Sequence, residues 1–397
     1  MAILQISAVL LGYVGAVLCA MAIILLVQVA ASFLPARRTR PLPAPRPFRF
    51  AVLVPAHDEA LVIGRTLASI FPQLSENDRV VVIADNCTDE TGRIAEDAGA
   101  EVFYRVDQTL RGKGYALDYA IRRLAGDPPD AVIFVDADCI AEPGSLRAIA
   151  EQSLAHRRPV QALYDLHSGS AEPANYLKVA SFAWAVKNYI RPLGLNRLGL
   201  PCQLMGTGMA FPWSVISQAD LNTGNIVEDL ELGLNLAAAG KAPLFFPAAI
   251  VSSDFPVSRE GQQTQRTRWE TGHLRMIWSR IPQLIRQGVL RGNWNLVVLA
   301  TDAAVPPLTL LSISIGAALL TTSILAAFGG SIVPLGISLM AAGALASSVI
   351  LAAKKLSINA ISLSNLGLIG GYAASKLAIY AGAMTGKPIE WVRSKRD

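Results

Sequence analysis

Residues 131–138 are Ala-Val-Ile-Phe-Val-Asp-Ala-Asp, a run of apolar side chains that ends in two carboxylates. A short continuous run of this kind, rich in β-branched and aromatic residues, predicts a strand that is buried on both faces. Three similar runs lie earlier in the chain, at residues 50–54, 80–84 and 101–104. The sequence therefore predicts a buried sheet that contains all four runs.

Helix-like stretches alternate with these strands, for example at residues 61–71, 91–98 and 115–124. Alternation of this kind predicts an α/β fold, a mostly parallel sheet covered by helices on both faces. In such sheets ligands bind outside the carboxyl ends of the strands. The residues that directly follow each strand are therefore the first candidates for a functional site.

Acidic side chains stand at these strand ends. Asp85 and Asp89 follow the second strand, and we expect Asp89 to cap the next helix. Asp136 and Asp138 alternate at the exit of the fourth strand, where two like charges would repel each other. A divalent cation, Mg²⁺ or Mn²⁺, would offset that repulsion, and such ions complete their coordination with substrate phosphates. Two unrelated surface acids are the alternative.

A flexible basic turn, Arg111-Gly-Lys-Gly114, opens the predicted helix at residues 115–124. Its Lys113 side chain and the helix-terminal N–H groups could face a phosphate. Gly92 and Gly99 form neither a GxGxxG pattern nor a Walker loop, which argues against dinucleotide-binding and P-loop folds.

The composition predicts a membrane protein with one globular domain. Of the 397 residues, 52% are hydrophobic and only 16% are charged, whereas soluble domains carry about 25% charged residues. The net charge of +5 comes from basic residues that flank apolar runs, so we expect a lipid bilayer and no nucleic acid as partner. The cysteines lack metal-site spacing and are expected to be reduced, structural thiols: Cys19, Cys87, Cys139 and Cys202.

Residues 1–36 carry no charged side chain and predict a transmembrane helix, apolar from Ile6 to Leu34. A cleaved signal peptide would have its positive charges before the apolar run, whereas here they follow it. The basic, proline-rich residues 37–49 predict a stiff linker on the cytoplasmic side. The N-terminus then lies outside, and residues 50–290 form a cytoplasmic domain of a protein integral to the plasma (inner) membrane.

Residues 291–397 are predicted to form a second membrane region with two or three spans. The apolar runs are about 305–328, 332–353 and, more weakly, 359–384. Lys354, Lys355 and the basic tail favour the cytoplasmic side, which would make the last run interfacial or re-entrant. A close-packed span is the alternative. Asp302, ahead of two prolines, marks a predicted interfacial helix.

Taken in order, the motifs from about Val52 to Trp269 resemble those of glycosyltransferase family 2. The resemblance is to its membrane-integrated branch, with the cellulose, chitin and hyaluronan synthases, and implies a GT-A fold. It implies that residues after the first two strands hold the nucleotide of a sugar donor, here Pro55, Ala56, Glu59 and Asp85. It also makes Asp136 and Asp138 the metal-binding DxD motif, with Asp138 as the more direct ligand.

Three later motifs complete the resemblance. It implies an acceptor-side Gly206-Thr207-Gly208, a catalytic pair Glu228-Asp229 with Asp229 as base, and a QxxRW signature at Gln265, Arg268 and Trp269. Arg268 suits a diphosphate and Trp269 a sugar ring. The alternative for Asp229 is a structural role, as a negative charge that stabilises the N-terminus of a helix. The alternative for Trp269 is an anchor at the membrane surface. The sequence departs from the family pattern at His57 and Val227.

The resemblance implies an inverting enzyme that adds sugars from a nucleotide-diphosphate donor, a UDP-sugar, to a growing β-linked polysaccharide. Transfer of a single sugar to a membrane lipid is a close alternative, because few spans leave little room for an export channel. The third hypothesis is a catalytically inactive, nucleotide-responsive partner of a polysaccharide secretion complex.

Overall fold

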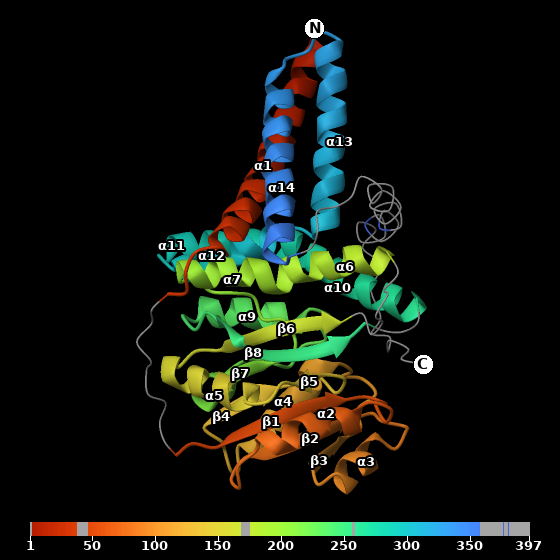
Figure 1. Cartoon of the computed structure of the whole chain (residues 1–397), viewed down its shortest axis with the longest axis vertical. Helices are drawn as coiled ribbons and strands as arrows, with labels where there is room; N and C mark the ends of the chain where they lie inside the picture. The colour runs from red at the N-terminus through yellow and green to blue at the C-terminus, as the bar shows by residue number, and fades with distance from the viewer. Residues whose placement is uncertain are drawn as a thin grey trace.

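The computed structural model describes residues 2–37, 47–167, 175–255 and 259–357, together with Lys376 and Tyr380. One eight-stranded sheet forms the lower part of the molecule, and three long helices stand together on one side of it (Figure 1). A layer of shorter helices separates the sheet from the long helices. The N-terminus lies at the far tip of the long helices.

The strands of the sheet follow the order β3-β2-β1-β4-β7-β6-β8-β5. Their bounds are β1 Phe50–Ala56, β2 Arg79–Asp85, β3 Glu101–Arg105, β4 Ala131–Phe134, β5 Ile140–Ala141, β6 Val160–His167, β7 Met209–Pro212 and β8 Leu244–Asp254. β1 pairs in parallel with β2 and β4, and β2 pairs in parallel with β3. The four strands and the parallel arrangement predicted from the apolar runs are therefore confirmed.

The second half of the sheet makes it mixed. β7 pairs antiparallel with both β4 and β6, β8 pairs parallel with β6, and β5 pairs antiparallel with β8. These strands include pieces of two and four residues, too short for a periodicity that sequence analysis could detect. They extend the predicted parallel half without changing the α/β class.

Helices cover both faces of the sheet, as predicted. Val52 of β1 is fully buried in one apolar cluster with Leu67 of α2 (Ile63–Ile70). Its neighbour Leu53 is fully buried on the opposite face with Leu117 of α4 (Lys113–Leu124). Burial of each such side chain contributes about 1.5–3 kcal/mol. The other elements around the sheet are η1 Phe71–Gln73, α3 Thr91–Asp97, α5 Ser145–His156, α8 Trp213–Ile216 and α9 Glu228–Ala238.

The intermediate layer lies across the base of the long helices (Figure 1). It consists of α6 Asn175–Ala185, the π-helical turn η2 Val186–Ile190, α7 Arg191–Leu198, α10 Arg259–Ser279, α11 Ile281–Leu290 and α12 Trp294–Ala304. Asp302, which the sequence placed on a helix ahead of two prolines, lies in α12 as expected. All four cysteines are free thiols.

Three helices in the described ranges are long and apolar enough to cross a bilayer: α1 (Ala2–Ala31), α13 (Leu308–Ala327) and α14 (Val333–Lys355). At most 28% of each apolar window is buried within the protein. Most of each helix therefore presents apolar side chains outward, as contact with lipid requires. Apart from Lys376 and Tyr380, the weaker run at 359–384 lies outside the described residues, as do positions 38–46 of the predicted linker.

A buried polar network ties α1 to the intermediate layer. Arg191 Nη2 donates to Asp302 Oδ1 at 2.7 Å, and Gln28 Nε2 of α1 donates to the same oxygen at 2.8 Å. Gln203 Nε2 donates to Asp302 Oδ2 at 2.6 Å. All four side chains are at least nine-tenths buried. The Asp302 carboxylate is therefore the centre that holds the candidate span α1, α7 and α12 together.

We predict that Asp302→Ala destabilises the protein by about 3–5 kcal/mol, because it leaves Arg191 buried without its counter-charge. Chemical unfolding of the detergent-solubilised protein measures the change. Gln28→Ala, which removes a neutral partner of the same carboxylate, is the control and should cost less. Equal stability of Asp302→Ala and the native protein would contradict the prediction.

Candidate active site

The carboxyl ends of three neighbouring strands open onto one cavity. Ala56 ends β1, Asp85 ends β2, and Asp136 follows β4 by two residues. Because these strands are adjacent and parallel, their ends lie at the same edge of the sheet. The cavity there has a volume of about 250 Å³. The site thus lies where ligands bind in open α/β sheets.

The cavity brings most of the predicted site residues together, although they are spread along the sequence from Pro55 to Trp269. Those that line it are Pro55, Ala56, Glu59, Asp85, Lys113, Asp136, Asp138, Gly206, Glu228, Asp229, Arg268 and Trp269. Asp138 and Asp229, 91 positions apart in the sequence, therefore share one cleft.

Two predicted residues, Thr207 and Gly208, are not among the described residues that line the cavity. Thr207 is fully buried behind it, where its hydroxyl accepts a hydrogen bond from the Asp136 N–H at 3.1 Å. The Gly208 carbonyl accepts from the Ala162 N–H at 2.8 Å and so joins the loop to β6. Thr207 thus supports the loop that carries Asp136, and Gly208 fixes its own loop to β6. Gln265 lies in α10, but its side chain is outside the described residues.

Lys113 stands at the centre of the acidic side chains. Its ammonium forms an ion pair with Asp136, donates to the Gly206 carbonyl at 2.7 Å and lies 3.9 Å from Glu228 Oε1. Burial alone would lower the pKa of Lys113, but the carboxylates of Asp136 and Glu228 raise it above its usual value. The lysine therefore stays charged and holds the acids together.

Gly206 lets these groups meet. Its φ of +90° suits glycine, and a Cβ at this position would lie 3.5 Å from Asp229 Oδ2 and 3.9 Å from Asp136 Oδ2. The two carboxylates thus flank the same small space. A side chain at Gly206 would occupy the space between the two acids.

The Glu228-Asp229 pair begins α9, where negative charge is favoured by the helix dipole. The predicted helix-terminal role therefore holds alongside a place on the cavity wall. Burial raises the pKa of both carboxyls, while the nearby Lys113 lowers both values. A buried carboxylate with a raised pKa is a stronger base than an exposed one, which suits proton transfer.

Asp136 and Asp138 offer a donor set that fits a divalent cation. Oxygens of both carboxylates and the Cys139 sulfur lie within 4.8 Å of one another. Burial raises the pKa of the Cys139 thiol well above its usual value, so the thiol stays protonated and is a poor ligand. Two carboxylate oxygens with room for phosphate oxygens match the preference of Mg²⁺ and Mn²⁺.

The side of the cavity predicted to bind the nucleotide is formed by the ends of β1 and β2, which are joined by hydrogen bonds. His57 Nδ1 lies 2.7 Å from the Asp85 carbonyl oxygen and so joins the ends of β1 and β2. Arg105 Nη1 donates to Asp85 Oδ1 at 2.6 Å. Burial raises the pKa of Asp85 even though Arg105 opposes that effect. His57, a departure from the family pattern, thus has a positioning contact of its own.

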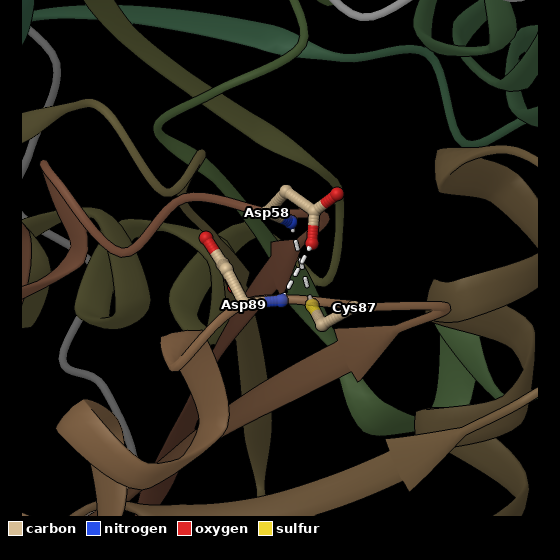
Figure 2. A group of neighbouring side chains, drawn as sticks. All are labelled: Asp58, Cys87 and Asp89. Carbon is tan, nitrogen blue, oxygen red and sulfur yellow. Dashed lines mark hydrogen bonds between the residues drawn. The ribbon is translucent and has the colours of Figure 1, made fainter.

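A second acidic group, Asp58, Cys87 and Asp89, lies beside this site (Figure 2). Its hydrogen bonds join the loop after β1 to the loop after β2. Asp58 Oδ1 accepts from the Asp89 N–H at 3.2 Å, and the Asp58 N–H donates to Cys87 Sγ at 3.4 Å. Asp89 Oδ1 accepts from the Thr91 N–H at 2.9 Å, at the start of α3. The N-cap residue of α3 is Glu90, so Asp89 contacts the start of the helix from one position earlier than the predicted cap.

Several cavity residues escaped the sequence analysis. Trp184 stacks on Trp269 with ring centroids 5.3 Å apart and meets Tyr164 edge-on at 5.1 Å. Lys187 and Asn188 of η2 also line the cavity. They belong to no motif; the only signal in the sequence is the lysines, Lys178 and Lys187, in a largely apolar helical stretch.

A protein-family model described as Glycosyltransferase like family 2 matches residues 45–272. Over 252 residues the chain is 23% identical to the probable glycosyltransferase YdaM of Bacillus subtilis (strain 168), which covers 60% of this chain and 58% of that protein. Over 88 residues it is 39% identical to 4,4'-diaponeurosporenoate glycosyltransferase of Staphylococcus aureus (strain USA300), a match that covers 22% of this chain and 23% of that protein. The matches thus span less than two thirds of the length of these curated relatives.

Among solved structures, the chain is similar to the mannosyltransferase PcManGT of Pyrobaculum calidifontis in complex with GDP-Man and Mn²⁺. The TM-score is 0.51 at 17% identity, and the match covers 87% of this chain and 98% of that one. This similarity supports the GT-A fold, including strands that the sequence did not predict.

We predict that the protein binds Mn²⁺ in the presence of uridine diphosphate and that Asp138→Asn weakens this binding by more than about tenfold, because even residues behind a metal ligand typically change affinity about 10–100-fold. Electron paramagnetic resonance of free Mn²⁺ measures the affinity. Asp89→Asn, in the second acidic group, is the control and should bind like the native protein. Loss of binding in Asp89→Asn alone would place the metal in that group instead.

Proposed function

This chain belongs to glycosyltransferase family 2, and we propose that it transfers one sugar, with inversion, from a nucleotide diphosphate to an acceptor anchored in the membrane. The observation that carries the proposal is the shared space beside Gly206. Asp136, expected on the donor side, and Asp229, expected on the acceptor side, both border it. Donor and acceptor could therefore meet there.

The proposed reaction is a single displacement. The acceptor oxygen forms a bond to the anomeric carbon of the sugar, and the bond from that carbon to the diphosphate oxygen breaks. The electron pair leaves with the diphosphate, and Asp229 takes the proton of the acceptor hydroxyl. A divalent cation held by Asp136 and Asp138 would supply positive charge beside the leaving diphosphate. Attack opposite the leaving group turns an α-linked donor into a β-linked product.

The remaining cavity residues have roles consistent with this step. Arg268 would contact the diphosphate and Trp269 would present its ring to a sugar, supported from behind by Trp184. Pro55, Ala56, Glu59 and Asp85 would hold the nucleoside. Lys113 keeps Asp136 and Glu228 in place. Glu228 thereby positions its neighbour Asp229.

We propose a UDP-sugar as the donor, with a GDP-sugar as the second candidate. The first follows from the resemblance to the membrane-integrated branch of the family. The second rests on the GDP-Man and Mn²⁺ in the complex of the similar mannosyltransferase. A panel of nucleotide hexoses supplied with Mg²⁺ or Mn²⁺ would identify the donor.

The packing of the spans favours a lipid acceptor over a polymer. Leu25 of α1, Ile315 of α13 and Leu345 of α14 are all at least nine-tenths buried in one apolar cluster. Side chains therefore fill the centre of the bundle, where an exported polysaccharide would pass. One relative is named for a non-polysaccharide acceptor, 4,4'-diaponeurosporenoate. Polymer synthesis, the other candidate, would need an export path outside these three spans.

We propose that the protein is integral to the plasma (inner) membrane, with the sheet domain in the cytoplasm. Its three candidate spans support the membrane location. The cytoplasmic placement of the sheet domain is supported by the basic residues after α1 and by Lys354 and Lys355 at the end of α14.

We predict that Asp229→Asn lowers sugar transfer by about 10²–10⁴-fold, the usual contribution of a general base. Donor binding should be unchanged, because the amide keeps the size of the side chain. Transfer of a labelled sugar by solubilised protein measures the rate, and calorimetry measures donor binding. Near-native turnover would show that the base lies elsewhere. An organic-soluble, singly extended product supports a lipid acceptor, and a long polymer supports the alternative.

We also predict that kcat/KM falls on the acidic side with an apparent pKa above the usual value of 3.8 for aspartate, because burial raises the pKa of Asp229. The base works when ionised, so activity is lost as the pH falls through this raised pKa. Lys113→Met should move the acidic limb to higher pH, since Lys113 lowers the pKa of Asp229. If the acidic limb of the pH profile does not move in Lys113→Met, Lys113 does not influence the pKa of the catalytic base.

A further inference from the structure

A second cavity of about 110 Å³ lies beside the first, on the side of the candidate spans. The two cavities share Trp184, Lys187, Trp269 and His273 in their walls. A ligand that filled both would therefore have one end beside Asp229 and the other beside the long helices.

The walls of the second cavity are mostly apolar beyond these shared residues. Leu25 belongs to span α1, and Leu308 is the first residue of span α13. The other apolar side chains on its wall come from α6, η2, the residue after β8 and the link between α12 and α13: Ala180, Ala183, Val186, Phe255, Val305, Pro306 and Pro307. Its polar residues beyond the shared ones are Arg191 and Glu270, both in ion pairs, and Thr309. The cavity thus lies where the spans meet the intermediate layer, and a hydrocarbon chain is the kind of ligand that it suits.

Lys187 stands at the junction of the two cavities. It is carried by the π-helical turn η2, a distortion that is frequent at functional sites. Although it is surrounded by protein, its side chain is solvent-accessible, because it lines both cavities. Burial lowers the pKa of Lys187, while the nearby Asp229 opposes this effect.

Asp229 is the carboxylate that acts most strongly on Lys187, followed by Glu270 and Asp302. Glu270 forms an ion pair with Lys376, and Asp302 forms one with Arg191. Within the described ranges, no carboxylate lies within ion-pair distance of Lys187, 4.0 Å. An anion carried by a ligand could therefore pair with the accessible Lys187 ammonium.

The next residue gives a second, independent indication. Asn188 is only 2% exposed and lines the first cavity, yet its Nδ2 group has no hydrogen-bond partner among the described residues. A buried donor without a partner is costly, and native proteins rarely leave one. A ligand oxygen next to Lys187 would satisfy it.

We propose that Lys187 and Asn188 bind the anionic head group of a lipid acceptor whose hydrocarbon chain occupies the second cavity and continues into the bilayer between α1 and α13. This inference rests on the proposed sugar transfer and names its acceptor as an anionic, single-chain or branched lipid. With its head group at the junction, the lipid would present a hydroxyl to Asp229 in the first cavity.

The test uses the full-length protein in detergent micelles and does not depend on turnover. The probe is lysophosphatidic acid with a brominated chain, which quenches nearby tryptophans such as Trp184 and Trp269. Lysophosphatidylcholine with the same chain, which is zwitterionic and has no net charge, serves as the reference. We expect saturable quenching by the phosphatidic form at lower concentration, and Trp184→Phe should remove part of the signal.

Lys187→Met should weaken the affinity for the brominated lysophosphatidic acid roughly tenfold to a hundredfold, as expected for loss of a charged hydrogen bond. Asn188→Ala should weaken it less. The matched control is Lys178→Met, which removes an exposed lysine of α6 that lines neither cavity. It should bind the lipid like the native protein.

Three results would overturn the inference: native affinity in Lys187→Met, equal quenching by both lipids, or displacement of the lipid by inorganic phosphate at equal concentration, which would identify a site for a free anion. Binding of a nucleotide sugar with Mn²⁺ to the same native sample separates the two claims. Donor binding without lipid binding refutes the acceptor assignment alone, whereas loss of donor binding refutes the proposed function.

Discussion

One partly buried lysine makes the cavity possible. Asp136, Glu228 and Asp229 come from different parts of the chain and meet at one partly buried cavity, where like charges repel. The Lys113 ammonium pairs with the first and lies 3.9 Å from the second. It offsets their repulsion, yet burial still leaves the pKa of Asp229 raised. The same charge balance thus holds the site together and tunes its base.

The position of this cavity between sheet and spans links chemistry to the membrane. Asp302 borders the first cavity and also fixes α1 through Gln28 and α7 through Arg191. The turn η2 begins one residue after α6 ends and carries Lys187 to the junction of both cavities. The helices that anchor the domain are therefore the helices that would receive an acceptor from the bilayer.

Sequence patterns predicted the parts of the fold with strong periodicity. The apolar runs predicted β1 to β4, and the acids at their ends predicted where the cavity lies. The patterns missed β5, β6, β7 and β8, whose pairing depends on strands far away in the sequence. They also gave Thr207 and Gly208 a place at the acceptor, whereas Thr207 is bonded to the Asp136 backbone and Gly208 to β6.

The sequence by itself determined the α/β class, the apolar spans and the identity of the acids, because these follow from local periodicity and from motifs in a fixed order. Only the tertiary structure decided which side chains surround Lys187, that the centre of the span bundle is filled, and that a second cavity lies beside the first. Each of these depends on residues far apart in the sequence, such as Leu25 and Leu345 of the span cluster, which are 320 positions apart. Packing between distant segments leaves no periodic pattern in the chain, since it is fixed by shape and charge complementarity in space.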